Sequence, residues 1–218
     1  ALEKQRTDMY DTKQEHGKRD RFGQKVLRRL LGQLKEYTED LVISEEAAAK
    51  RTGLFDGEFS IVFTYLLLYE IGREEEYLEL ARLHTGKILP LLLKDGSFDL
   101  LGGNAGGVLG LLKLYDITGE GVYLAAAQKA GDLLYSRAER MEHGIGWRGA
   151  EAGKTPLCGM AHGNAGILAA FARLYQKTGE RKFCDACIQC LDYEDSMYEE
   201  QFHDWKDLRE EAASHGQK

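Results

Sequence analysis

Two kinds of helical segment alternate along the middle of the chain. One kind is apolar nearly all round, as in residues 108–112, and this pattern is typical of a helix buried on every side. The segment after it is amphipathic, with charged residues on one face and Ala or Cys on the other. No segment shows the alternation of a β-strand. The pattern therefore predicts an all-α protein made of helix pairs.

Each predicted inner helix begins after a glycine cluster, and a short turn containing Gly follows it. The inner helices are expected at 60–71, 106–117 and 166–177. The outer amphipathic helices are expected at 75–89, 121–137 and 181–193. A further helix is predicted over 22–41, in the N-terminal region.

The helix pairs are copies of one repeat. The tetrapeptide Gly-Asn-Ala-Gly occurs at 103–106 and again at 163–166, and Thr-Gly-Glu follows at the same distance in both copies. A third copy lies upstream and places Gly57 opposite Gly103. Repeated helical hairpins predict an α/α barrel or toroid, and a straight solenoid is the competing geometry.

Composition supports long helices and narrows the functional classes. The chain has 25 Gly but only 2 Pro, and few prolines favour uninterrupted helices. The net charge of -7 argues against a nucleic-acid-binding protein, which usually carries a basic face. The longest apolar stretch, 61–69, is too short to span a bilayer. Four cysteines do not suggest a secreted disulfide scaffold, so we expect a cytoplasmic protein.

The glycine loops are interpreted first as sites of close packing between neighbouring helices. A phosphate-binding loop is the alternative, but no Lys-Ser/Thr pair follows the glycines and no strand precedes them. The residues that break the repeat are more informative. Asp99 stands where the other copies have glycine, and His162 stands where they have Gly102 and Asp56. If all three loops line one end of a barrel, Asp99 and His162 meet at its mouth. Because histidine changes charge near neutral pH, His162 is a candidate for proton exchange.

The other candidate functional residues also have simpler structural interpretations. Cys184, Cys187 and Cys190 have a spacing that resembles an iron–sulfur motif, but on one helix they are better explained as small buried residues. Cys158 either packs within its loop or supplies a thiol near His162. Trp147 and Arg148, the candidate substrate-binding residues, either line the mouth and contact a peptide or belong to a solvated loop.

Several motifs, in order, resemble the lanthionine synthetase C-like family. Residues 156–167 resemble its Ser/Ala-His-Gly-x-x-Gly-Ile motif, residues 97–106 its Asp-Leu-x-x-Gly-x-x-Gly loop, and residues 53–57 its first glycine loop. Residues 191–194 and 203–209 resemble the Tyr-Glu and Asn-Trp-x-Asp-Leu-Arg segments in the cyclase domain of class II lanthipeptide synthetases. The resemblance covers 52–209.

This resemblance implies an α/α toroid and a reaction. The family adds a peptide Cys thiol to dehydroalanine or dehydrobutyrine and forms a (methyl)lanthionine thioether. Zinc binds the thiol and lowers its pKa, and an acid protonates the enolate that forms. By motif match, His162 corresponds to the active-site histidine and Asp99 to the active-site aspartate. The implied partner is a dehydrated precursor peptide.

Two departures from the family pattern shape the expected organisation. First, the zinc ligands of the family follow the Trp-x-Asp-Leu-Arg segment, so no zinc ligand is expected in this chain. Second, the helical hairpin that the family has between the first and second copies is missing from this sequence. We therefore expect an incomplete toroid of about three repeats over 52–209, an N-terminal helical segment over 1–51, and a frayed tail over 210–218. Because the chain starts at Ala1, we expect an excised or truncated piece.

Three functional hypotheses follow. The leading one is the cyclase, incomplete and inactive alone. The second is a half-toroid that binds a peptide without turnover. The third is a glycosidase, which would use Asp56 and Asp99 as paired carboxylates. An open toroid would expose apolar faces such as 61–68, so we also predict self-association or docking with a dehydratase domain or the remainder of the toroid.

Overall fold

The computed structural model describes residues 23, 25–26, 28–36, 52–94, 96–149 and 155–209. The chain divides into two compact units, 1–43 and 44–218. In the first unit residues 28–36 are helical, which lies within the helix predicted at 22–41. The predicted domain boundary at residue 51 and the predicted tail over 210–218 lie outside the described residues.

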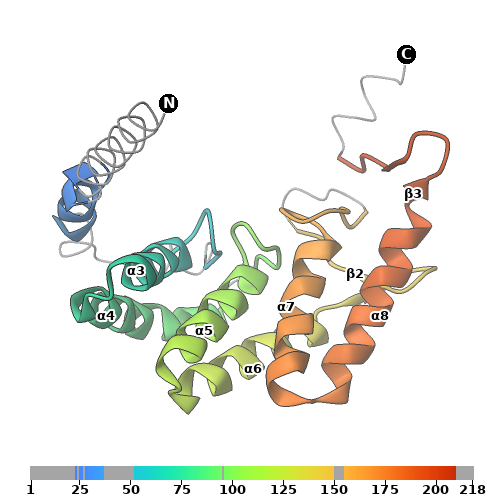
Figure 1. The fold of residues 1–218 in the computed structure, drawn as a ribbon. Coiled ribbons are helices and arrows are strands. Elements are labelled where there is room, and N and C mark those ends of the chain that lie inside the picture. Colours follow the sequence, from blue (N-terminus) through green and yellow to red (C-terminus); the bar gives the residue numbers. More distant parts are fainter. Residues whose placement is uncertain are drawn as a thin grey trace, which may run out of the picture. The chain divides into compact units, whose positions relative to one another are not determined.

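The second unit contains the three predicted helical hairpins (Figure 1). The first pairs α3 with α4, the second α5 with α6, and the third α7 with α8. The bounds are Phe59–Gly72 for α3, Glu75–Leu92 for α4, Asn104–Thr118 for α5, Gly121–Ser136 for α6, Asn164–Thr178 for α7 and Arg181–Ser196 for α8. The predicted all-α class and the hairpin repeat are confirmed.

Within this unit the first helix of each hairpin is the inner one. Helix α5 packs against both α3 and α7, and each inner helix also packs against its own outer partner. The inner helices supply many of the fully buried side chains, among them Leu66, Leu111 and Phe171. Burial on several sides explains why these segments are apolar nearly all round.

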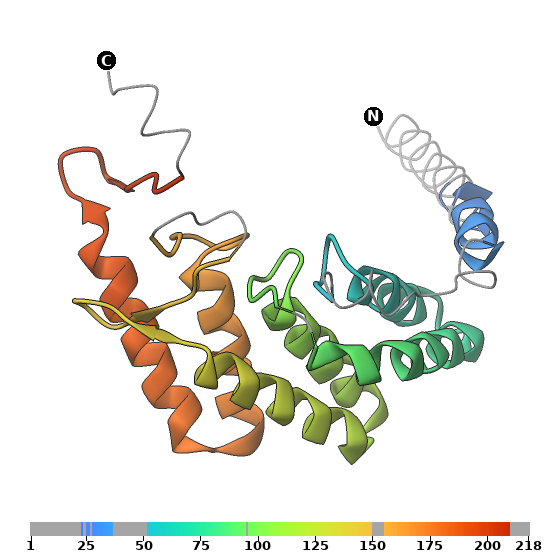
Figure 2. The same cartoon turned by 180° about the vertical axis from the view of Figure 1, so that it is seen from behind.

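Four short strands correct the expectation that the chain contains none. β1 (Glu139–Arg140) pairs antiparallel with β2 (Ile145–Gly146), and β3 (Tyr198–Glu199) pairs antiparallel with β4 (Asp204–Trp205). The first pair lies in the connection between α6 and α7, where β2 packs against α8 (Figure 2). Strands of two residues are too short to produce an alternating pattern, so the sequence could not reveal them.

The apolar face over 61–68, which was expected to be exposed, is partly buried. Val62, Tyr65 and Leu66 are buried, whereas Leu67 is 40% exposed and Ile71 is 71% exposed. Self-association through this face stays a prediction. No described helix has both the length and the apolar character that crossing a bilayer demands.

A residue with a left-handed backbone conformation follows the last residue of each inner helix. Gly119 (φ 72°) and Gly179 (φ 70°) donate their backbone N–H groups to the carbonyls of Tyr115 and Tyr175. In the first copy Gly72 is the last helical residue, and Arg73 takes the left-handed conformation at φ 54°. The backbone geometry is thus kept even where the glycine is replaced.

Substituting Gly119 with Ala is expected to destabilise the protein by about 1 kcal/mol, because a Cβ atom is disfavoured in the left-handed conformation. Thermal unfolding should show a loss of about 2–4 °C. Gly121→Ala is the matched control, since Gly121 lies two residues away with open space around it and no positive φ. Equal midpoints for the two variants would contradict the prediction.

Candidate active site

The three glycine loops meet at one end of the inner helices. The N–H of Gly53 donates to the carbonyl of Gly102 at 2.9 Å, which joins the first loop to the second. The N–H of Leu101 donates to the carbonyl of Ala161 at 3.1 Å, which joins the second loop to the third. Figure 1 shows these loops at the N-terminal ends of α3, α5 and α7. Residues far apart in sequence therefore share one surface.

Close packing explains the glycines of these loops. A Cβ atom on Gly53 would lie 2.2 Å from the carbonyl oxygen of Leu101. A Cβ atom on Gly106 would lie 2.3 Å from both the carbonyl oxygen of Leu100 and the backbone nitrogen of Leu54. These distances leave no room for a side chain. The packing interpretation of the glycine clusters is confirmed.

Backbone N–H groups fix the carboxylate of Asp99. Its Oδ1 atom accepts hydrogen bonds from the N–H groups of Gly102 at 2.8 Å and Gly103 at 3.1 Å. Both donors precede α5 in the same loop, and Gly103 is the N-cap residue of that helix. These two backbone donors hold the carboxylate in place at the start of α5.

The second oxygen of Asp99 contacts His162 across the loop boundary. Asp99 Oδ2 lies 2.9 Å from His162 Nδ1, and the two side chains are 20% and 39% exposed. An ionised carboxylate can only accept, so Nδ1 carries the hydrogen and Nε2 remains for other partners. The structure thus brings together the two residues that the sequence singled out as catalytic candidates. With both of its oxygens engaged, Asp99 is better suited to orient His162 than to act as a glycosidase acid beside Asp56.

A cavity of about 430 Å³ borders the imidazole. One wall is the loop that precedes α7, and the other is the segment that begins at β4. The lining residues are Leu157, Cys158, Gly159, Met160, Ala161, His162, Asp204, Trp205, Lys206, Asp207, Leu208 and Arg209. Apolar, aromatic and charged side chains therefore border the histidine.

Glu194 is a site residue that sequence reasoning did not single out. It projects from α8, is only 7% exposed, and accepts the N–H groups of Gly159 at 3.0 Å and Ala165 at 2.9 Å. Its neighbour Tyr193 donates its hydroxyl to the carbonyl of Pro156 at 2.6 Å. The one sequence signal was the Tyr-Glu pair itself, which matched a family segment without indicating that it faces the His162 loop.

Cys158 lies in the same cavity as His162, but its thiol is held in the protonated form. Burial, and next the negative charge of Glu194, raise the pKa of Cys158 from an ordinary value of 9.0 to about 12. Since the thiolate is the nucleophilic form, Cys158 is a poor nucleophile at neutral pH.

Alkylation of Cys158 by iodoacetamide at pH 8 is expected to be about 10³-fold slower than that of glutathione, because far less thiolate is present. The rate should keep rising with pH beyond the point at which an ordinary thiol is fully ionised. Peptide mapping by mass spectrometry measures this site separately from the other cysteines. A rate that levels off near pH 9 would contradict the raised pKa.

The two candidate substrate-binding residues are placed differently. Trp147 is 4% exposed, donates its indole N–H to the carbonyl of Leu134 at 2.8 Å, and packs against Phe171. Arg148 is half-exposed and forms an ion pair with Glu139 at 2.8 Å. Neither residue is among those that line the cavity beside His162. Contact of either with a peptide stays a prediction.

The cysteines of α8 face different surroundings. Cys190 is fully buried, while the half-buried Cys187 has its Sγ 3.7 Å from the carbonyl of Leu168. Burial raises the pKa of Cys187 to about 11. Within the described part of the chain, no three His, Cys, Asp or Glu side chains converge as a metal site. The interpretation as packing residues is the better one for Cys190.

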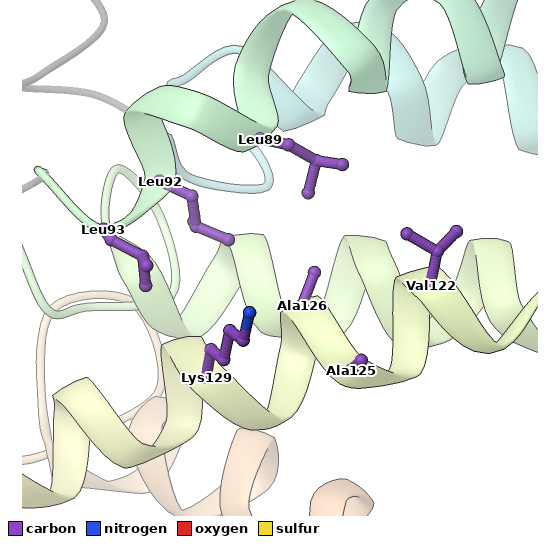
Figure 3. Close-up of a pocket in the computed structure, with 7 residues that line it drawn as sticks. All are labelled: Leu89, Leu92, Leu93, Val122, Ala125, Ala126 and Lys129. Carbon is purple, nitrogen blue, oxygen red and sulfur yellow. The ribbon is translucent and has the colours of Figure 1, made fainter.

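A second hollow, of about 270 Å³, lies between α4 and α6 (Figure 3). Its walls are apolar except for Lys129, with the remaining lining from Leu89, Leu92, Leu93, Val122, Ala125 and Ala126. This hollow has no acid–base pair, so the cavity beside His162 is the better candidate for chemistry.

A comparison with family models matches residues 9–217 to the lanthionine synthetase C-like protein model. The chain belongs to the lanthionine synthetase C-like family. A search of the curated proteins finds no match. Membership agrees with the hairpin repeat, and the described helices form part of the α/α toroid that the sequence predicted.

Membership in the lanthionine synthetase C-like family carries the general function of that family, which is cyclisation of peptide substrates. Members of the family generally bind zinc. The described residues do not fit such an ion, because no group of three ligating side chains is present among them. We therefore assign no metal ligand in this chain and derive no step through zinc.

Proposed function

We propose that this chain supplies the acid–base part of a lanthipeptide cyclase of the class II type. In this proposal a Cys thiol of a dehydrated precursor peptide adds to dehydroalanine or dehydrobutyrine. His162 is the catalytic acid and base, and Asp99 is its positioning residue. Residues 52–209 form the functional part of the chain.

The observation that carries this proposal is the 2.9 Å contact between Asp99 and His162. The two residues come from different repeats, yet they meet beside a cavity of about 430 Å³. The carboxylate holds Nδ1 as the donor and leaves Nε2 with a lone pair that can exchange a proton with a bound peptide.

The reaction needs one proton to move from sulfur to carbon. Nε2 of His162 takes the thiol proton as the new S–Cβ bond forms, and the electron pair of the Cα=Cβ bond moves into the enolate of the peptide. The resulting imidazolium then protonates Cα. The imidazole returns to its starting state, and the product contains every atom of the reactant. Asp99 stabilises the transient imidazolium through its contact with Nδ1.

The test is to incubate the whole chain with a dehydrated precursor peptide and follow the loss of the peptide's free thiols with a maleimide probe. Mass does not change on cyclisation, so the thiol count is the informative readout. The sequence predicted a chain that is inactive alone, whereas the pairing of Asp99 with His162 leads us to expect thiols to disappear faster than in peptide alone. Peptide binding without acceleration would instead support the second hypothesis, a peptide-binding half-toroid, and absence of both would overturn the proposal.

A further inference from the structure

The loop that carries His162 is closed by one buried carboxylate. Glu194 reaches from α8 and accepts the N–H of Gly159, three residues before the histidine, and that of Ala165, three residues after it. The same oxygen, Oε1, receives both hydrogen bonds. Together with the backbone hydrogen bond from the N–H of Asn164 to the carbonyl of Leu157 at 3.0 Å, this side chain joins the two ends of a turn whose middle presents the imidazole to the cavity.

The partners of Glu194 are backbone donors around the start of α7. This 7% exposed carboxylate accepts the N–H groups of Gly159 and Ala165. Ala165 is in the first turn of α7, whose N-cap residue Gly163 makes no side-chain capping bond. The carboxylate of Glu194 therefore acts as the cap of this helix from outside and gains from the helix dipole.

We propose that Glu194 is a positioning residue for His162, which acts by fixing the loop that holds the imidazole against Asp99. Three residues separate His162 from each hydrogen-bonded N–H, so a loosened loop would move the imidazole relative to Asp99 Oδ2. Asp99 itself is fixed independently by Gly102 and Gly103. Loss of the Glu194 bonds would thus act directly on His162, and it would reach Asp99 only through the hydrogen bond between Leu101 and Ala161.

The thiol of Cys158 reports the state of the same carboxylate. Cys158 immediately precedes Gly159, and the charge of Glu194 and a hydrogen bond to it add to burial in keeping the thiol protonated. The charge of Glu194 also acts on Tyr193, whose hydroxyl bonds to the carbonyl of Pro156, and on the buried thiol of Cys190 on the same helix. Replacing the charged carboxylate of Glu194 with a neutral amide is therefore expected to make the Cys158 thiol more reactive, while an acceptor oxygen stays in place on residue 194.

The inference rests on the proposed role of His162, but its test needs no substrate. Three variants are compared with the natural chain: Glu194→Ala, which removes the carboxylate, Glu194→Gln, which keeps an acceptor oxygen, and Asp195→Asn, an exposed neighbour on α8 as the control. The first readout is the tautomer of His162 from the ring nitrogen shifts in long-range ¹H–¹⁵N NMR spectra. The second is the alkylation rate of Cys158 at pH 8, and thermal unfolding reports folding.

We expect the Nδ1–H tautomer to dominate in the natural chain, to be lost in Glu194→Ala, and to return in Glu194→Gln. Alkylation of Cys158 should rise about tenfold in Glu194→Gln, because the negative charge is gone. Asp195→Asn should change neither readout. A helix cap alone would alter thermal unfolding but not the tautomer, so a retained Nδ1–H tautomer in a folded Glu194→Ala variant would overturn the inference.

If Glu194→Ala does not fold, Glu194→Gln decides the question. An unchanged alkylation rate or a lost Nδ1–H tautomer in that variant would overturn the inference. The cyclisation assay can also fail while the Nδ1–H tautomer is present and depends on Glu194. That result would count against the proposed function and leave the positioning role standing.

Discussion

Replacing His162 with Ala is expected to slow cyclisation of a dehydrated peptide by about 10²- to 10⁴-fold, the usual contribution of a positioned acid–base group. The imidazole both accepts the thiol proton and returns it to Cα, so its loss affects both halves of the reaction. The measurement is the rate of free-thiol loss from the peptide, corrected for the reaction without protein. The slowing should appear mainly in kcat, because the variant removes proton transfer rather than the walls of the cavity.

Two controls make this result specific. His143→Ala removes another exposed histidine, which is absent from the cavity lining, and should leave the rate unchanged. Asp99→Asn keeps the shape of the side chain but allows the amide to donate towards Nδ1, so it should reduce the rate by holding the wrong tautomer. Equal rates for His162→Ala and the natural chain would exclude His162 as the catalytic group.

Substituting Gly166 with Ala is expected to destabilise the second unit by about 3 kcal/mol, the largest stability effect that we predict. An added Cβ would lie 2.2 Å from the carbonyl oxygen of Met160 and 2.8 Å from Cβ of Leu100. Neither contact can be relieved by turning a flexible side chain. The loop before α7 would have to move, and with it the contact between His162 and Asp99.

Thermal unfolding measures the effect, and a fall of about 6–12 °C is expected for a protein of this size. Gly86→Ala is the matched control, because Gly86 also lies within a helix but has nothing within 4 Å of an added Cβ. That control should be neutral or slightly stabilising, since Ala is the better helix former. A Gly166→Ala variant as stable as Gly86→Ala would show that the loops adjust without cost.

The helices could be predicted from the repeat, whereas the exact end of a helix and the two-residue strands could not. The inner helix predicted at 106–117 is observed as Asn104–Thr118, because a long apolar run bounded by glycines has few alternatives. Helix α4 was expected to stop at residue 89, before Pro90, but it runs to Leu92. Pro90 removes one backbone donor and crowds the carbonyl of the preceding turn, and the helix ends two residues later.

The candidate site was predicted only in part. Asp99 and His162 were found because they differ from the residues at the same positions of the other copies, which is visible in the sequence without any structure. Glu194 was not found, because the partners of its carboxylate are backbone N–H groups in the loop before α7 and in the first turn of that helix. A backbone donor has no residue identity, so no sequence pattern marks it.

The sequence by itself determined the helix type, the pairing of inner with outer helices and the repeat, because hydrophobic periodicity and glycine placement are local properties. It also determined which residues break the repeat. Only the tertiary structure decided that the loops of the second and third repeats share a surface, that Asp99 reaches His162, and that Cys158 is buried beside Glu194. These contacts depend on how whole helices pack against each other, and the packing angle and distance are set by many side chains together.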